Sequence, residues 1–144
     1  MVEADGSARR PLKAPAAHEP VVPASADAVI AVAGLNGLGR PLTAEHLFRP
    51  ELWSRVTGVA AGAPITAESV AAAALHPEGL LKGCPAGARG ILFLNRADAP
   101  ERRAAAAEIA ARLAAAPASR VCRVAAGRLL PAPALEVLMT RASA

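Results

Sequence analysis

Long apolar runs alternate with alanine-rich segments along this chain. Residues 27–35, DAVIAVAGL, form an almost continuous apolar run that ends in a glycine cluster at 34, 37 and 39. Such a run is typical of a strand that is buried on both faces of a parallel sheet. Apolar runs at about 90–94 and at 120–125 predict a second and a third strand.

The alanine-rich segments between these runs predict helices. Two segments begin at Thr43 and Thr66, and each threonine stands two positions before a glutamate, so it can cap a short helix. Pro50 and Pro77 are expected to delimit these helices. The longest helix is predicted within 99–116, with Pro100 in its first turn.

The two ends of the chain are less regular. MVEAD, residues 1–5, predicts the end of a buried strand that runs into a turn. Residues 8–26 contain prolines at 11, 15, 20 and 23 and predict a long loop, because proline lacks the backbone N–H that a central strand needs. Loops of this length are usually functional. The tail from residue 129 predicts a short helix or an edge segment, with 136–144 frayed.

The order of these elements predicts an α/β fold with a mostly parallel sheet and flanking helices. A length of 144 residues fits a single domain. Ligands of such sheets bind beyond the carboxyl ends of the strands. We therefore expect three segments to share one rim: EADGS at the end of the strand predicted at residues 1–5, GLNGLGR after the strand at 27–35 and NRAD after the strand at 90–94.

Charge and composition narrow the class of partner. The formal net charge of +4 suits an anionic partner such as a nucleotide, although arginine in an alanine-rich chain can equally be a compositional habit. Only 2% of the residues are aromatic, which argues against a surface that stacks nucleic-acid bases. No apolar run has the roughly 20 residues of a membrane helix, so we expect a cytoplasmic protein without membrane contact. The distant Cys84 and Cys122 are expected to be reduced thiols.

The stretch LNRAD at 94–98 carries the sharpest chemical signal, because it is similar to the N-K-x-D signature of GTP-binding proteins. An ionised Asp98 can accept both N–H groups on the Watson–Crick edge of guanine, whereas adenine cannot satisfy it, and Asn95 can brace the loop. The alternative is that Asp98 only caps the helix that begins near Pro100.

Other polar residues have weaker signals. Glu3 and Asp5 lie two positions apart in a predicted strand and could bind Mg²⁺, although Asp5-Gly6 is also an ordinary turn dipeptide. A further group could contact a phosphate or a partner protein, or merely close loops: Arg9, Lys13, His18, Glu19, His76, Glu78 and Lys82. The phosphate-binding sequence G-x-x-x-x-G-K-[ST] does not occur in the chain.

Five segments, taken in order, resemble the YqeC family of selenium-dependent hydroxylase accessory proteins. They are VEADGSARRPLKAPAAHEPVVP, VIAVAGLNGLGRPL, LFRPELWSRVTG, HPEGLLKG and LNRAD. The resemblance implies a P-loop NTPase-like three-layer sandwich and a role in the maturation of molybdenum hydroxylases. It also implies that this chain is the C-terminal portion of such a protein, because the family's phosphate loop precedes the strand ending in VEADGS.

The resemblance also assigns roles to particular residues. Glu3 and Asp5 would lie beside the metal of a Mg²⁺-bound GTP or ATP, and Asn95, Arg96 and Asp98 beside the base. Arg96 replaces the customary lysine of the signature and can still lay its stem against the base. The expected partners are an N-terminal P-loop half and a molybdenum hydroxylase or its maturation proteins. A non-catalytic module that docks on such a hydroxylase is the alternative.

Overall fold

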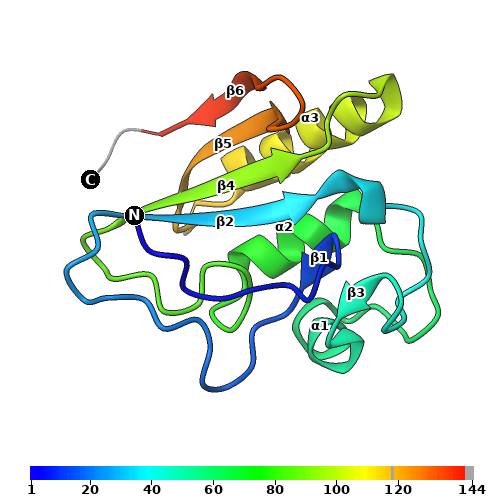
Figure 1. Cartoon of the computed structure of the whole chain (residues 1–144), viewed down its shortest axis with the longest axis horizontal. Helices are drawn as coiled ribbons and strands as arrows, with labels where there is room; N and C mark the ends of the chain where they lie inside the picture. The colour runs from blue at the N-terminus through cyan, green and yellow to red at the C-terminus, as the bar shows by residue number, and fades with distance from the viewer. Residues whose placement is uncertain (118, 142–144) are drawn as a thin grey trace.

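A four-stranded sheet in the order β2-β4-β5-β6 forms the centre of the protein (Figure 1). The computed structural model describes residues 1–117 and 119–141. The strands are β2 (Ala28–Gly34), β4 (Arg89–Asn95), β5 (Val121–Arg128) and β6 (Ala134–Thr140). β2, β4 and β5 are parallel, and β6 is antiparallel to β5. The expected α/β fold with a mostly parallel sheet is therefore confirmed.

Three helices accompany the sheet: α1 (Pro50–Thr57), α2 (Ala67–Leu75) and α3 (Pro100–Ala115). The predicted cap of α2 is confirmed, because the Thr66 side chain accepts from the Ser69 N–H while the Ser69 hydroxyl oxygen accepts from the Thr66 N–H. Pro100 is the first residue of α3, as expected. Proline is suited to this position because a backbone N–H there would have no hydrogen-bond partner within the helix.

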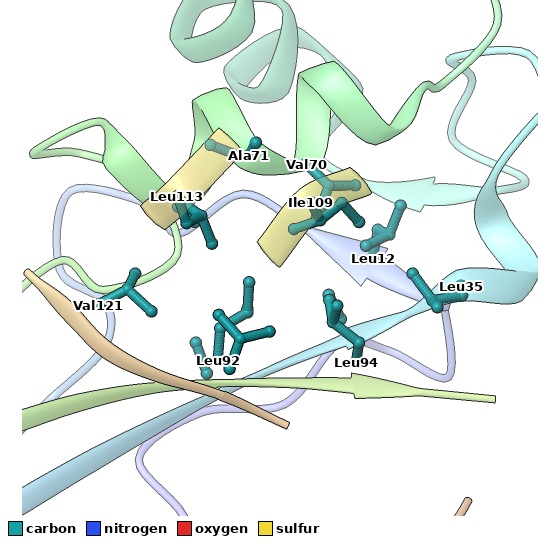
Figure 2. Packing of buried hydrophobic residues seen from close by; sticks show 14 of the residues in the cluster. Leu12, Leu35, Val70, Ala71, Leu92, Leu94, Ile109, Leu113 and Val121 are labelled. Carbon is teal, nitrogen blue, oxygen red and sulfur yellow. The ribbon is translucent and has the colours of Figure 1, made fainter. Parts of the chain in front are cut away.

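The core lies between the sheet and the helices α2 and α3. Leu92 and Leu94 of β4 point toward the helices and pack near Ile109 and Leu113 of α3 (Figure 2). Small residues bring the layers close together. On α2, Val70 and three of its alanines are buried, and the two buried side chains of β2 are Ala31 and Ala33. An alanine-rich sequence can therefore form a closely packed core.

A small second sheet is attached beside the carboxyl end of β2. β1 (Leu12–Lys13) pairs in parallel with β3 (Leu47–Phe48). The N–H of Gly34 donates to the carbonyl of Pro11 at 2.8 Å. A Cβ on Gly34 would lie 2.8 Å from that carbonyl oxygen, so this contact requires glycine. The glycine-rich segment at the end of β2 includes the short 3₁₀ helix η1 (Leu35–Gly37). It packs against Pro11 and Leu12 through Gly34 and Gly37.

The opposite face of the large sheet is exposed, which corrects two expectations. Side chains of β2 and β6 on this face are more than half exposed, and they are Ile30, Val32, Leu135 and Val137. β2 is therefore buried on one face only, although its sequence is apolar on both. In the described residues there is no second helical layer, so the expected three-layer sandwich is present only as two layers.

Further expectations from the sequence were wrong in detail. Residues 1–5 form no strand, and α1 begins at Pro50 instead of ending there. Thr43 lies before a turn and does not cap α1, whose N-cap is Arg49. Residues 136–140 belong to strand β6 and are not frayed, while 142–144 lie outside the described residues. No helix among the described residues is long and apolar enough to cross a membrane.

Candidate functional site

The loop between β4 and α3 holds the residues with the sharpest chemical prediction. Asn95 ends β4 and pairs in register with Gly34 of β2, so the two predicted rim segments after these strands do meet. The Asn95 side-chain oxygen accepts from the Arg96 N–H at 2.9 Å, which braces the turn as expected. Arg96 has a left-handed backbone with φ of 64°, and the next N–H, from Ala97, donates to the Gly127 carbonyl of β5.

Asp98 does not cap the helix that follows it. The N-cap of α3 is Ala99, and no side chain caps this end. The Asp98 carboxylate is 42% exposed, and its nearest cationic partner is Arg102, with 3.8 Å between Oδ1 and Nη2. Its backbone carbonyl accepts from Arg103 at 3.3 Å. The alternative role as a cap is therefore not what the structure shows, and the carboxylate keeps free acceptor capacity.

A pocket of about 340 Å³ opens beside Asp98 at the carboxyl ends of β4 and β5. Its lining residues are Ala97, Asp98, Arg103, Ala126, Gly127, Arg128, Ala134, Leu135 and Glu136. The pocket thus lies where parallel sheets bind ligands, between a strand end and a helix N-terminus. Two arginines and two carboxylates give it donors and acceptors for a polar heterocycle.

The sequence did not reveal the other polar residues of this pocket. Arg103, Arg128 and Glu136 come from α3, β5 and β6, and no local motif joins them. Arg128 also donates to the Ala132 carbonyl at 3.1 Å, which shapes the turn between β5 and β6. Only the order of the strands could have placed these residues beside Asp98, and β6 was not firmly predicted.

A second polar cluster is built around Glu19 in the proline-rich loop. The Glu19 carboxylate accepts from both terminal nitrogens of Arg49, one of them at 3.0 Å, and from Lys13 at 2.9 Å. Lys13 also pairs with Asp5 at 2.8 Å. The Arg49 guanidinium lies 4.4 Å from the centre of the Phe48 ring. Arg49, which the sequence did not single out, is thus the main partner of Glu19.

The electrostatics of this cluster favour the ionised carboxylate. Hydrogen bonds from Arg49 and then from Lys13 hold the pKa of Glu19 far below its ordinary value, and outweigh the opposing effect of burial. The Glu19 side chain is only 20% exposed, and so is that of Arg49. We conclude that Lys13 and Glu19 fasten the loop 8–26 onto β3 and are not free for a phosphate.

The motif HPEGLLKG supports the same loop. Lys82 donates to the carbonyls of Ala16 and Ala17, at 2.9 and 3.2 Å, and pairs with Glu78 at 3.0 Å. The His76 ring nitrogen Nδ1 accepts from the Glu78 N–H. His18, His76 and Arg9 are exposed at the surface. Of the residues expected to contact a phosphate or a partner, these three and Glu78 remain accessible, and Lys82 is engaged.

The acidic residues proposed for the metal lie elsewhere. Glu3 is exposed, Asp5 pairs with Lys13, and neither lines the pocket beside Asp98. Within the described ranges no group of three His, Cys, Asp or Glu side chains is arranged to hold a metal ion. The residues present therefore do not fit a complete Mg²⁺ site, because Mg²⁺ needs several oxygen ligands and Asp5 already neutralises a lysine.

Both cysteines are free thiols, as expected. Cys84 is buried, and this burial raises the pKa of its thiol. We therefore expect the Cys84 thiol to be unreactive, because the thiolate is the reactive form.

Comparisons with known proteins connect these features to one group of proteins. A family model described as YqeC protein matches residues 1–51, which include Asp5, Lys13, Glu19 and Arg49 of the second cluster. The uncharacterized protein YqeC of Escherichia coli K12 is 38% identical over 109 residues, or 76% of this chain. The match covers 43% of the length of that relative. No solved structure matches the chain.

Proposed function

Because the chain belongs to the YqeC family, we propose that it supplies the base-binding side of a nucleotide-binding protein. In this proposal the complete protein is an accessory factor that helps to mature selenium-dependent molybdenum hydroxylases. Its complete fold is a P-loop NTPase-like sandwich, to which this chain contributes the described sheet and one layer of helices.

The position of Asp98 is the observation that carries the proposal. Its carboxylate borders a pocket of about 340 Å³, is not used to cap α3, and follows a parallel strand. A guanine base in the pocket would donate its N1–H and its exocyclic amine to the two carboxylate oxygens. Asn95 supports the site indirectly, by fixing the turn that presents Asp98. These contacts favour GTP over ATP.

The phosphates and their Mg²⁺ require a second part of the protein. The chain has no G-x-x-x-x-G-K-[ST] sequence, and Gly34 and Gly37 pack against Pro11 and Leu12. We propose that an N-terminal P-loop half grips the phosphates and carries the Mg²⁺ complex. Asp5 would contribute to the metal only after release from Lys13. In cells, the assembled protein would act in the cytoplasm.

Nucleotide specificity gives the sharpest test of this proposal. Xanthine has a carbonyl where guanine has its exocyclic amine, so an asparagine at position 98 can donate to it while still accepting from N1–H. We expect Asp98→Asn to weaken Mg²⁺-GTP binding at least tenfold and to strengthen binding of the xanthosine triphosphate, measured by calorimetric titration of the assembled protein.

The control is Asp27→Asn, a matched substitution at an exposed residue just before β2, at the opposite end of the sheet. It should leave both affinities unchanged. Equal loss of binding for both nucleotides in Asp98→Asn, or binding unaffected by it, would contradict the base-binding role. An assembled and folded protein that binds neither GTP nor ATP would reject the proposed function.

A second candidate function is a non-catalytic module that docks on a molybdenum hydroxylase or a maturation partner. The observation in its favour is the loop 8–26, which contacts from Lys13, Arg49 and Lys82 hold in one conformation with Val21 73% exposed. A preformed loop with an exposed apolar tip suits protein recognition. Pull-down of the hydroxylase by the parent, lost in Val21→Asp and independent of nucleotide, would favour this candidate.

A further inference from the structure

The exposed face of the large sheet carries an apolar surface that spans all four strands. The register places the side chains of Ile30 and Val32 on the same face as Ile91 and Phe93 of β4. Val137 and Leu135 of β6 continue this surface beyond β5. We call these six residues the open face. Ile30, Val32, Leu135 and Val137 are more than half exposed and Phe93 is 8% exposed, whereas parallel sheets are ordinarily covered on both faces.

The outer edge of β2 is also available. β2 is the end strand of the large sheet, and its ladder runs only to β4. On the outer side, the described residues form a single backbone hydrogen bond with β2, at its carboxyl end, from the Gly34 N–H to the Pro11 carbonyl. An unprotected edge of a parallel sheet can accept a further strand, and the strand β2 is seven residues long.

The open face has positive charge at its amino-terminal end. Arg89 pairs in register with Ala28, and Arg123 with Ile91, so both lie on this side of the sheet. A small pocket of about 110 Å³ lies between them, with Cys122, Thr140 and Arg141 in its wall. Neither Arg89 nor Arg123 forms an ion pair with any residue that the structure describes.

We propose that the open face and the β2 edge are the docking surface for the other part of a YqeC protein. This occupant is an α/β polypeptide that adds a parallel strand to β2 and packs an apolar helix on the open face. It brings at least one carboxylate to Arg89 and Arg123. The length of the relative supports this occupant, because the matched region is only 43% of YqeC from E. coli, and more than half of that protein lies outside it.

Charge argues against a second copy of this chain as the occupant. The side chains that the strand register places on the exposed face are apolar, arginine, threonine or asparagine, and none of those described is a carboxylate. Two copies packed face to face would therefore bury four arginines in one interface with no carboxylate on either face, which disfavours that arrangement. A distinct polypeptide with acidic residues is the complementary partner.

The test uses a defined probe, the region of E. coli YqeC outside the match, expressed as a separate chain. Mixed with this protein in the absence of nucleotide, it should form a 1:1 complex detected by light scattering after size exclusion. The double substitution Ile30→Lys and Val32→Lys should weaken the complex at least tenfold. The exposure of both side chains means that the variant should keep its circular dichroism spectrum and Tm.

The matched control is Leu75→Lys, which places the same lysine on an exposed apolar residue at the end of α2, a helix on the opposite face of the sheet. It should bind the probe as well as the parent does. The proposal is overturned if the folded parent does not bind the probe, or if the double variant binds it equally well. A homodimer of the parent that the double substitution dissociates would identify a second copy as the occupant, and would also overturn it. Since no nucleotide is present, this result is independent of base binding at Asp98.

Discussion

At the scale of single residues, Glu19 is the carboxylate whose pKa its hydrogen-bond partners hold far below the ordinary value. Its partners, Lys13 and Arg49, come from positions 6 and 30 residues away in the sequence. The separation explains why the sequence identified Glu19 and Lys13 as polar candidates but missed Arg49. Proximity in the fold, and not a local motif, turns these residues into a clamp for the loop 8–26.

The pH dependence of stability should reveal this clamp. The pKa of Glu19 is lowered by folding from an ordinary value of 4.5, so its contribution to stability is complete above that pH and is lost as the pH falls below it. We expect the free energy of unfolding of Glu19→Gln to be lower by about 2 kcal/mol near neutral pH, as for other hydrogen bonds to charged groups.

Urea denaturation of the two proteins from pH 7 down to pH 3 measures this difference in the free energy of unfolding. The difference should shrink toward acid pH, because protonation of Glu19 in the unfolded state destabilises the folded parent, whereas glutamine binds no proton. Glu45→Gln removes a carboxylate that is 81% exposed, and it should follow the parent. A constant gap between parent and Glu19→Gln across the acid range would argue that Glu19 acts by packing alone.

At the scale of elements, local sequence patterns predicted which strands and helices exist better than they predicted which of their faces are buried. The apolar runs correctly located β2, β4 and β5, and Pro100 correctly marked the start of α3. The same patterns could not show that β2 has an exposed face, because its sequence is apolar on both sides. Residues 1–5 resembled a strand, but no strand among the described residues pairs with them, and strand formation depends on such a neighbour.

The residues of the candidate site also fall into two groups, those that a local sequence pattern revealed and those that it did not. Asn95, Arg96 and Asp98 were found because a strand end, a turn and a helix start follow one another in the sequence. Arg128 and Glu136 were not found, because β5 and β6 bring them to the pocket through the order of the sheet. The sequence therefore predicts the functional residues of a single loop, whereas the other residues that line the pocket depend on the order of the strands in the sheet.

The two threonines expected to cap helices behave differently in the structure, which makes a matched test. Thr66 accepts from the Ser69 N–H at 3.1 Å, whereas α1 begins seven residues after Thr43. Thr66→Ala should therefore lower the free energy of unfolding by about 1 kcal/mol, the usual cost of a lost N-cap. Thr43→Ala should cost clearly less, as measured by urea denaturation. Equal losses would mean that the Thr66 hydroxyl does not act as a cap.

At the scale of the whole molecule, one continuous core joins the large and the small sheet. Leu12 of β1 is 1% exposed, and it lies near Leu35 and Ile109, beneath the helices that cover the large sheet (Figure 2). Trp53, the single tryptophan, is fully buried on α1 and belongs to the same hydrophobic cluster. The attachment of β1 to β2 through Pro11 and Gly34 adds a backbone link between the sheets.

This continuity predicts that the chain unfolds as one unit. Trp53 fluorescence reports on α1 beside the small sheet, while far-UV circular dichroism is dominated by the helices and the large sheet. The two signals should give coincident urea transitions, because a shared core makes unfolding cooperative. Leu12→Ala should shift both midpoints together, with a loss of about 2 to 5 kcal/mol, since it leaves a cavity between the sheets. If the substitution moved the fluorescence transition alone, the small sheet and α1 would form a separate folding unit, and the expected single domain would be wrong.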